Sequence, residues 1–176
     1  MIDRALPALA ALLLLSAPAL AGTDDNPSGL PLPRFVTTRS DPINVRVGPG
    51  VQYNLAWVYN VAGTPVEIVQ EFDVWRKIRD VDGSEGWVHQ NMLSSARAGY
   101  VSQDAGNQVG LRAGASDDAG VVAWVAPGFP VKISSCDGNW CAVVATDHPA
   151  DGHPANYSGY LPEGDLWGVV KGETFD

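Results

Sequence analysis

Short segments in which apolar and polar residues alternate recur along the chain. Val66-Glu67-Ile68 and Val131-Lys132-Ile133 both alternate with the period of a half-buried β-strand. A proline begins each of these segments, at a position where a missing N–H is tolerated. Asp82-Gly83 marks a tight hairpin turn, and no stretch after Ala21 has sustained helical periodicity. Short strands with closely spaced turns predict an all-β protein built as a small barrel or sandwich.

This pattern occurs twice in the same order, which indicates an internal duplication of a unit of roughly 60–70 residues. Four pairs of segments carry the repeat: 43–50 with 109–116, 63–69 with 128–134, Trp75 with Trp140, and 86–93 with 159–166. In the second unit one hairpin is longer by about eight residues, and prolines make its tip irregular.

The first residues have the features of an export signal. Arg4 precedes a short apolar run that ends near Leu15, and Ala19-Leu20-Ala21 is a small-x-small cleavage pattern. The run is too short to cross a bilayer core of ~30 Å as a helix. We therefore expect a signal peptide over residues 1–21 and a secreted or periplasmic mature protein; a retained membrane anchor is the alternative. No later segment is long and apolar enough to be an integral membrane segment.

The composition narrows the possible partners. The formal net charge is -9, with 45% hydrophobic and 18% charged residues, which is ordinary for a globular protein. A surface this acidic repels phosphate backbones, so nucleic acid is not an expected partner, whereas cationic partners and neutral polymers remain open. Six tryptophans and five tyrosines exceed what a core of this size needs, so some should be half exposed.

The two cysteines, Cys136 and Cys141, flank the turn signal Asp137-Gly138. Export to an oxidising space favours a disulfide between them, and a folded-back hairpin would bring the sulfurs within reach. A metal or redox site is the less favoured alternative, because there are only two thiols and no histidine nearby. If Val143 faces the core and Lys132 faces solvent, a β-bulge must lie between them for the sulfurs to meet.

The segments "INVRVGPG", "GTPVEIV" and "WRKIRDVDGSEGWVHQNML" together resemble the bacterial SH3-like (SH3b) domain family, in particular its exported tandem members. The matching residues are Asn44, Val45, Arg46, Gly48, Pro49, Gly63, Val66, Trp75, Ile78, Gly86, Trp87, Val88 and Leu93. The second unit departs from the family pattern at Gly110, Ala115 and Tyr160. The resemblance therefore implies two tandem SH3-like β-barrels, but not a ligand site shared by both.

These observations divide the chain into a signal peptide (1–21), a flexible lead-in (22–33), a first SH3-like domain (34–95) and a second (99–170), joined by "SSARAG". Alignment of the two units puts Glu71 at the place of Cys136 and Arg76 at the place of Cys141. We expect an ion pair where the second unit has its disulfide. An exposed pair contributes ~0–1 kcal/mol and a disulfide about 2–4 kcal/mol.

Neither an enzyme nor a metal or cofactor site is predicted. Asp80, Asp82 and Glu85 surround a tight turn, where acidic residues commonly stabilise the turn itself. His89 has no serine or cysteine motif near it for which it could act as a base. The long hairpin holds the remaining metal candidates, whose spacing matches no known motif: His148, His153, Asp147 and Asp151. A metal-dependent role through this loop is the least favoured alternative. Exported hydrolases that carry SH3-like domains use a separate catalytic domain, for which we expect no room here.

The aromatic residues of the first unit are the candidate ligand-binding surface: Tyr53, Trp57, Tyr59, Trp75 and Trp87. They either line a groove for an extended peptide or seal the barrel ends and the contact between units. Arg46 is either a ligand anchor or a latch for its own loop. We expect a non-catalytic binding module for an extended peptide, a peptidoglycan peptide or an envelope protein. A structural or regulatory subunit of an envelope complex is the alternative.

Overall fold

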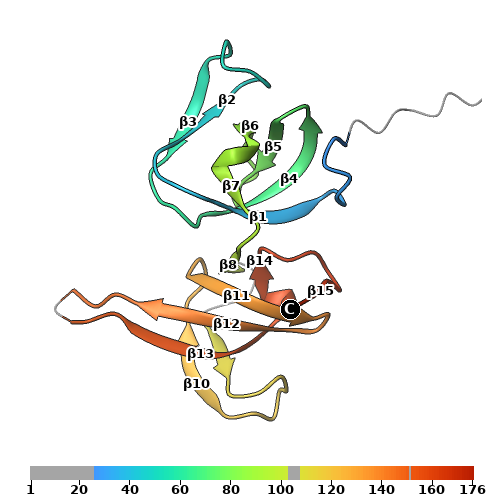
Figure 1. Cartoon of the computed structure of the whole chain (residues 1–176). Helices are drawn as coiled ribbons and strands as arrows, with labels where there is room; N and C mark the ends of the chain where they lie inside the picture. Colours follow the sequence, from blue (N-terminus) through green and yellow to red (C-terminus); the bar gives the residue numbers. More distant parts are fainter. Residues whose placement is uncertain (1–25, 103–107, 151) are drawn as a thin grey trace, which may run out of the picture.

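The computed structural model describes residues 26–102, 108–150 and 152–176, and the predicted signal peptide lies outside them. The described residues form two antiparallel β-sheets, each curled around its own core (Figure 1). No helix in these residues has the length and apolarity needed to cross a bilayer. The prediction of an all-β fold with two separate barrels is confirmed.

The first sheet has the strand order β3-β2-β6-β5-β4-β1-β7. Its elements are β1 (Arg34–Thr38), β2 (Ile43–Arg46), β3 (Leu55–Tyr59), β4 (Pro65–Phe72), β5 (Trp75–Arg79), β6 (Glu85–His89), the short 3₁₀ helix η1 (Gln90–Met92) and β7 (Leu93–Ser94).

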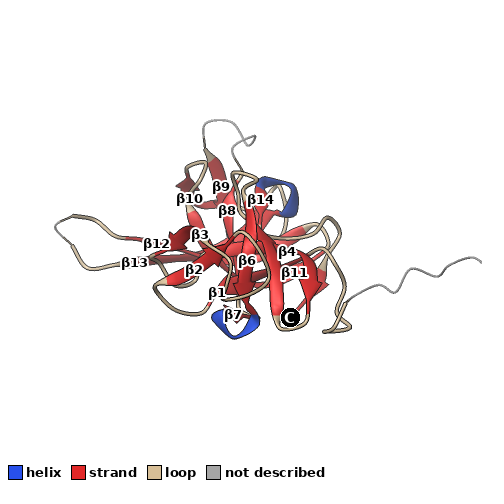
Figure 2. Ribbon diagram, turned by 90° about the horizontal axis from the view of Figure 1, so that it is seen from above, coloured by secondary structure: helices blue, strands red, loops and turns tan. Residues whose placement is uncertain are grey.

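The second sheet has the order β10-β9-β13-β12-β11-β8-β14, which repeats the first strand for strand. Its elements are β8 (Arg97–Val101), β9 (Val109–Arg112), β10 (Val121–Val125), β11 (Pro130–Asp137), β12 (Trp140–Asp147), β13 (Ala155–Pro162), η3 (Glu163–Asp165), β14 (Leu166–Trp167) and β15 (Thr174–Phe175). The strand β15 pairs with β11 and has no counterpart in the first barrel. The hairpin of β12 and β13 protrudes from the barrel (Figure 2).

The alternation in β4 places Val66 and Ile68 inside the first barrel, where each is at most 2% exposed, and leaves Glu67 outside. Ile78 and Val88 complete the same core from β5 and β6. The inward position of Val66 and Ile68 follows from the alternation of this segment, because a period of 2 assigns successive side chains to opposite sheet faces.

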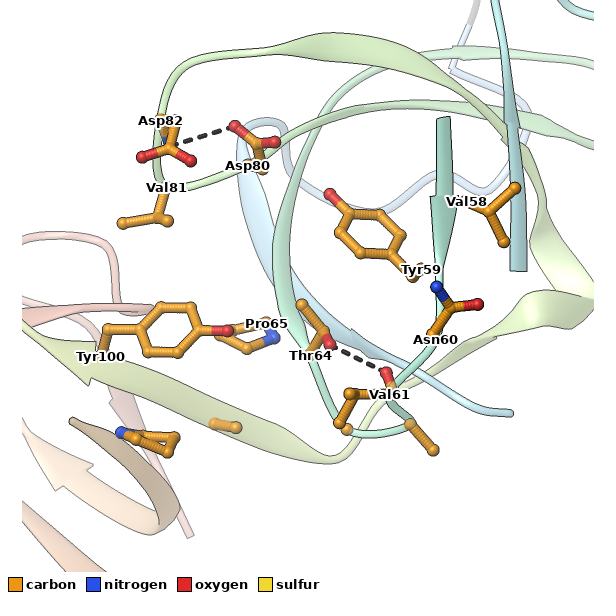
Figure 3. Close-up of a pocket in the computed structure, with 14 residues that line it drawn as sticks. Val58, Tyr59, Asn60, Val61, Thr64, Pro65, Asp80, Val81, Asp82 and Tyr100 are labelled. Atoms are coloured by element: carbon orange, nitrogen blue, oxygen red, sulfur yellow. Dashed lines mark hydrogen bonds between the residues drawn. The ribbon is translucent and has the colours of Figure 1, made fainter. Parts of the chain in front are cut away.

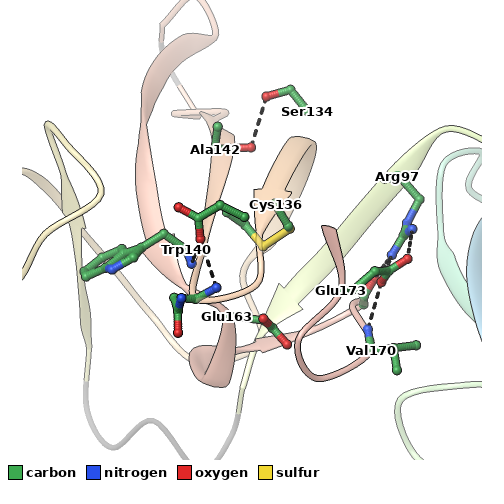
Figure 4. Close-up of a disulfide and its surroundings, with 12 residues drawn as sticks. Arg97, Ser134, Cys136, Trp140, Ala142, Glu163, Val170 and Glu173 are labelled. Atoms are coloured by element: carbon green, nitrogen blue, oxygen red, sulfur yellow. Dashed lines mark hydrogen bonds and ion pairs between the residues drawn. A yellow bond between two sulfur atoms is a disulfide. The ribbon is translucent and has the colours of Figure 1, made fainter. Parts of the chain in front are cut away.

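A β-bulge interrupts the alternation in both long hairpins. The register between β4 and β5 shifts after Ile68, and that between β11 and β12 shifts after Ile133. Because each bulge adds one residue, Cys136 comes to face Cys141, and the disulfide between them is formed (Figure 4). Both the bulge and the disulfide confirm the prediction.

The same bulge places Glu71 opposite Arg76, whose Nε lies 3.1 Å from the Glu71 carboxylate. The expected ion pair is therefore present, but it is buried rather than exposed: Glu71 is 1% and Arg76 5% exposed. Arg34 contacts the same carboxylate from β1. Burial by itself would raise the pKa of Glu71, but hydrogen bonds from Arg34 and Ser28 outweigh it and lower that pKa.

Segments outside the expected domain limits are anchored to the barrels. Ser28 donates from its backbone N–H and its hydroxyl to Glu71, both at 2.8 Å, so part of the lead-in is held against the first barrel. Arg97, the counterpart of Arg34, forms a two-point ion pair with Glu173 (Figure 4). Its guanidinium lies over the ring of Phe175. The strands of the second barrel thus run from Arg97 to Phe175, beyond the expected 99–170.

Equivalent glycines allow each sheet to close. A Cβ at Gly86 would lie 2.4 Å from a side-chain carbon of Val45, and one at Gly159 would lie 2.4 Å from the carbonyl oxygen of Arg112. These positions are where β6 crosses β2 and where β13 crosses β9. Only a residue without a side chain permits so close an approach of two strands.

Gly159→Ala is expected to lower the free energy of unfolding by about 1–3 kcal/mol, because the new methyl group overpacks against backbone that cannot move away. Chemical denaturation of the full chain measures this effect. Gly164→Ala is the matched control, since a Cβ there meets no atom within 4 Å, and it should change stability by less than about 0.5 kcal/mol. Equal effects of the two substitutions would contradict the closure role of Gly159.

Candidate binding cleft between the two barrels

A cleft of about 450 Å³ lies where the two barrels meet (Figure 3). The end of β3, the loop from β3 to β4 and the turn from β5 to β6 form its wall in the first barrel, while β8 and the start of β11 form the opposite wall. Its lining residues include Tyr59, Asp80, Val81, Asp82, Tyr100 and Pro130.

Direct contacts between the barrels hold the walls of this cleft together. Only Ser95 and Ala96 separate β7 from β8. The Thr37 hydroxyl of the first barrel donates to the carbonyl oxygen of Ala96 at 3.1 Å. The rings of Phe35 and Trp167 form a T-shaped pair with centroids 5.1 Å apart, and Trp167 in turn stacks on Tyr100. Aromatic packing across the junction thus positions Tyr100 relative to the first barrel.

Two tyrosines contribute rings from opposite walls. Tyr59 is the last residue of β3, and Tyr100 reaches in from β8 of the second barrel (Figure 3). Burial raises the pKa of Tyr59 to about 12. Burial, together with the charges of Asp80 and Asp82, also raises the pKa of Tyr100. Both side chains are therefore neutral phenols at physiological pH, and the Tyr59 hydroxyl is buried inside the first barrel, so Tyr59 meets the cleft with part of its ring.

Two carboxylates come from the turn between β5 and β6. Asp80 Oδ1 accepts hydrogen bonds from the backbone N–H groups of Asp82 and Ser84, at 3.0 and 2.8 Å. The turn that the sequence predicted is therefore present, with Asp80 stabilising it and Gly83 at a φ of 83°. The Asp82 side chain, by contrast, has no hydrogen bond or ion pair within the described part of the chain. Since Asp82 is exposed, solvent and ligand can both reach it.

An adjoining hollow of about 370 Å³ continues the cleft across the second barrel. It shares Val81, Asp82 and Tyr100 with the first hollow and ends at Trp167. The shared residues make the two hollows one groove, which we call the junction groove.

Of the aromatic residues singled out in the sequence, only Tyr59 lines the junction groove. Trp57 packs beside it against the barrel core, with ring centroids 6.1 Å apart. Trp75, the first residue of β5, lies against His89 with ring centroids 5.6 Å apart. Trp87 faces Lys77 across the outer side of the sheet. The aromatic residues are thus divided among several places and do not form a single surface.

Arg46 and Tyr53 form a latch for their own loop. The Arg46 guanidinium donates to the carbonyl oxygen of Tyr53 at 2.8 Å. In the second barrel Arg112 donates to Ala119 in the same way at 3.0 Å. The same bond in both barrels indicates a role in loop structure. His89 likewise has a structural contact, since its Nδ1 accepts from the Asn91 N–H at the start of η1.

Tyr100, Trp167 and Phe35 were not predicted from the sequence to be parts of a site. They come from three different strands, and no motif links them. The only signal for them in the sequence was the excess of aromatic residues. Their convergence depends on how one barrel sits on the other.

The long hairpin offers no metal cluster within the described residues, where no three or more His, Cys, Asp or Glu side chains come together. His148 and His153 are exposed, and Asp151 lies outside the described residues. The sequence-based expectation that this hairpin binds no metal stays a prediction.

Comparison with known proteins identifies one family. The family model of the bacterial SH3 domain matches residues 39–95 and 105–168, one segment in each barrel. Among solved structures, NlpC2 from Trichomonas vaginalis is similar with a TM-score of 0.33 and 11% identity, over 77% of this chain and 48% of that one. NlpC1 from the same organism has a TM-score of 0.32 and 12% identity, over 78% and 46%. The chain thus spans less than half the length of each. Comparison with curated proteins gives no match.

Proposed function

The chain belongs to the bacterial SH3 domain family, with one domain in each barrel, and from this premise we propose that it is a non-catalytic module that binds an extended peptide in the junction groove. Membership of the family supports a binding role in general. The peptide and its place on the molecule are our proposal.

The observation that carries the proposal is the groove itself, which both barrels are needed to build. Its two hollows, of about 450 and 370 Å³, lie within the size range of ligand sites. Apolar and aromatic residues line it together with two carboxylates, and grooves of this kind between the loops of small barrels hold extended peptides. The stacked pair of Tyr100 and Trp167 gives it a rigid aromatic wall.

The residues of the groove favour binding over chemistry. Both cysteines are joined in the disulfide and lie elsewhere in the fold. Within the described part of the chain, the groove lining contains no histidine or lysine that could serve as a base for a nucleophile. Asp80 and Asp82 belong to one turn. The Asp80 carboxylate accepts hydrogen bonds from backbone amides of that turn, which supports a role in holding the turn rather than in catalysis.

We place the protein in the cell envelope, as a periplasmic or secreted protein, and peptidoglycan stem peptides or envelope proteins as the source of its ligand. The signal-peptide pattern of residues 1–21 motivates this placement. The disulfide is in keeping with an oxidising compartment.

Tyr59→Ala and Tyr100→Ala are each expected to weaken retention of the full-length mature protein on purified peptidoglycan sacculi at low salt by about tenfold, since a central aromatic contact is worth more than about 1 kcal/mol. A co-sedimentation titration measures the affinity. Tyr157→Ala, at an exposed tyrosine of β13 outside the groove, is the matched control and should retain wild-type affinity. Absence of any retention of the wild-type protein would remove the cell-wall ligand. A loss confined to Tyr157→Ala would move the site away from the groove.

A second candidate function, as a fixed structural or regulatory subunit, is favoured by the surface of β10. This edge strand, "VVAWV", has no charged residue, and Trp124 is 63% exposed. An unprotected apolar edge is a place where another chain can dock. Crosslinking in cells separates the two functions, because a fixed subunit gives one dominant adduct through β10 and a peptide binder does not.

A further inference from the structure

The junction groove has an unbalanced negative charge. Asp80 and Asp82 both line it, and no lysine, arginine or histidine is among the described residues of either hollow. A neighbouring carboxylate is paired: Glu85, three residues beyond Asp82, contacts both Lys77 and Arg79 within 2.7 Å. Asp82 therefore differs from its neighbour in having a carboxylate free to receive a cation.

Aromatic side chains line the same groove as these carboxylates. Tyr59 and Tyr100 remain neutral, as their raised pKa values indicate, and Trp167 stacks on Tyr100 with an interplanar angle of 25°. The face of a neutral aromatic ring carries partial negative charge and attracts cations within about 6 Å of its centre. Carboxylates and ring faces in one groove therefore favour the same kind of ligand group.

We propose that the junction groove selects its peptide by a protonated primary amine at the end of a flexible side chain, which pairs with Asp82 while its stem crosses the faces of Tyr59 and Tyr100. This inference rests on the proposed function and names the ligand group that the groove recognises. A lysine-type side chain meets the requirement, because its methylene stem covers apolar surface and its ammonium group donates three hydrogen bonds.

Other ligand groups fit the groove less well. Anionic groups are repelled by both carboxylates, and the chain as a whole carries a formal charge of -9. A divalent metal ion needs more oxygen or nitrogen ligands than one turn provides, and Asp80 Oδ1 already accepts two backbone hydrogen bonds. Within the described residues no third acidic, histidine or cysteine side chain completes such a site.

The test compares two labelled extended peptides of equal length that differ only in one residue, lysine or the uncharged norleucine, in fluorescence-anisotropy titrations of the full-length mature protein. The lysine peptide is expected to bind about tenfold more tightly at low salt, and the difference should shrink at high salt because the pair is solvent-accessible. Asp82→Asn should remove most of this preference and leave the norleucine peptide unaffected. Asp118→Asn, the same change at an exposed aspartate between β9 and β10, is the matched control and should keep the preference.

The outcomes separate this inference from the proposed function. Equal binding of the two peptides, with a loss on Tyr100→Ala, would overturn the inference and leave the peptide-binding function intact. Failure of both peptides to bind would overturn both. A lysine preference that persists in Asp82→Asn would also overturn the inference. Circular dichroism of Asp82→Asn should match the wild type, since only the backbone of Asp82 takes part in the turn.

Discussion

Glu71→Ala is expected to lower the free energy of unfolding of the first barrel by about 3–5 kcal/mol, because it leaves buried cations without their counter-charge. Arg34 and Arg76 converge on this one carboxylate, and their side chains are only 17% and 7% exposed. Arg76 retains its bonds to Asp73 and Gln90, which hold its guanidinium in place but do not neutralise it. The substitution also releases Ser28 and with it the end of the lead-in.

Guanidinium denaturation of the full chain measures the loss, and hydrogen exchange of the β4 and β5 amides assigns it to the first barrel. The matched control is Glu67→Ala on the same strand, where the ion pair to Arg79 spans 3.2 Å and Arg79 is 45% exposed. An exposed pair contributes at most about 1 kcal/mol, so this control should cost little. A Glu71→Ala loss as small as that of Glu67→Ala would show that the buried cluster does not stabilise the fold.

The same residue should make stability depend on pH in a defined direction. The pKa of Glu71 is lower in the folded protein than its ordinary value of 4.5. Such a carboxylate stabilises the fold fully above its ordinary pKa, and this contribution is lost as the pH falls through the lowered value. The wild-type protein should therefore lose more stability than Glu71→Ala when the pH is lowered below about 4.5. An identical acid dependence of the two proteins would contradict the cluster as its source.

Replacing Cys136 and Cys141 together by alanine is expected to destabilise the second barrel by roughly 2 kcal/mol. The disulfide closes a short loop, since its cysteines are only five positions apart, and loop-closure entropy grows with loop length. The value therefore lies at the lower end of what disulfides contribute. Both cysteines are buried, which protects the bond from reductant in the folded state.

Denaturation with and without dithiothreitol checks this prediction. Reductant present during unfolding should shift the wild-type transition toward that of the double variant and leave the variant unchanged. Hydrogen exchange should place the change in β11 and β12, with the first barrel unaffected because it holds no cysteine. A double variant as stable as the wild type would show that the packing of β15 on β11 already supplies the constraint.

The features that sequence reasoning predicted correctly all lie within one hairpin or follow from alignment of the two units. The side chains of a strand alternate with period 2, so Val66 and Ile68 could be assigned to the core directly. Strict alternation from Lys132 and from Val143 would put Cys136 and Cys141 on opposite faces of the sheet, so a bulge was required for the disulfide. The alignment of the repeats then placed Glu71 opposite Arg76. Each of these predictions needed only neighbouring positions on paired strands.

The burial of the Glu71 pair was beyond such reasoning. Alternation indicates which face of a strand a side chain occupies, but not what else covers that face. In the first barrel it is covered by Ser28 of the lead-in and by Arg34 at the start of β1. In the second, β15 and Glu173 cover the matching edge. Both covering segments are distant in sequence from the strands that they protect.

The sequence by itself determined the two β-barrels, their internal repeat, the core alternation and the disulfide, because strand period and turn formation act over a few residues and the repeat supplied a second copy to compare. Only the tertiary structure decided where a ligand could bind. Tyr59 and Asp82 of one barrel and Tyr100 and Trp167 of the other form a groove only because Phe35 and Trp167 pack across the junction at one angle. No local pattern encodes that angle, since it follows from contacts between residues far apart in the chain.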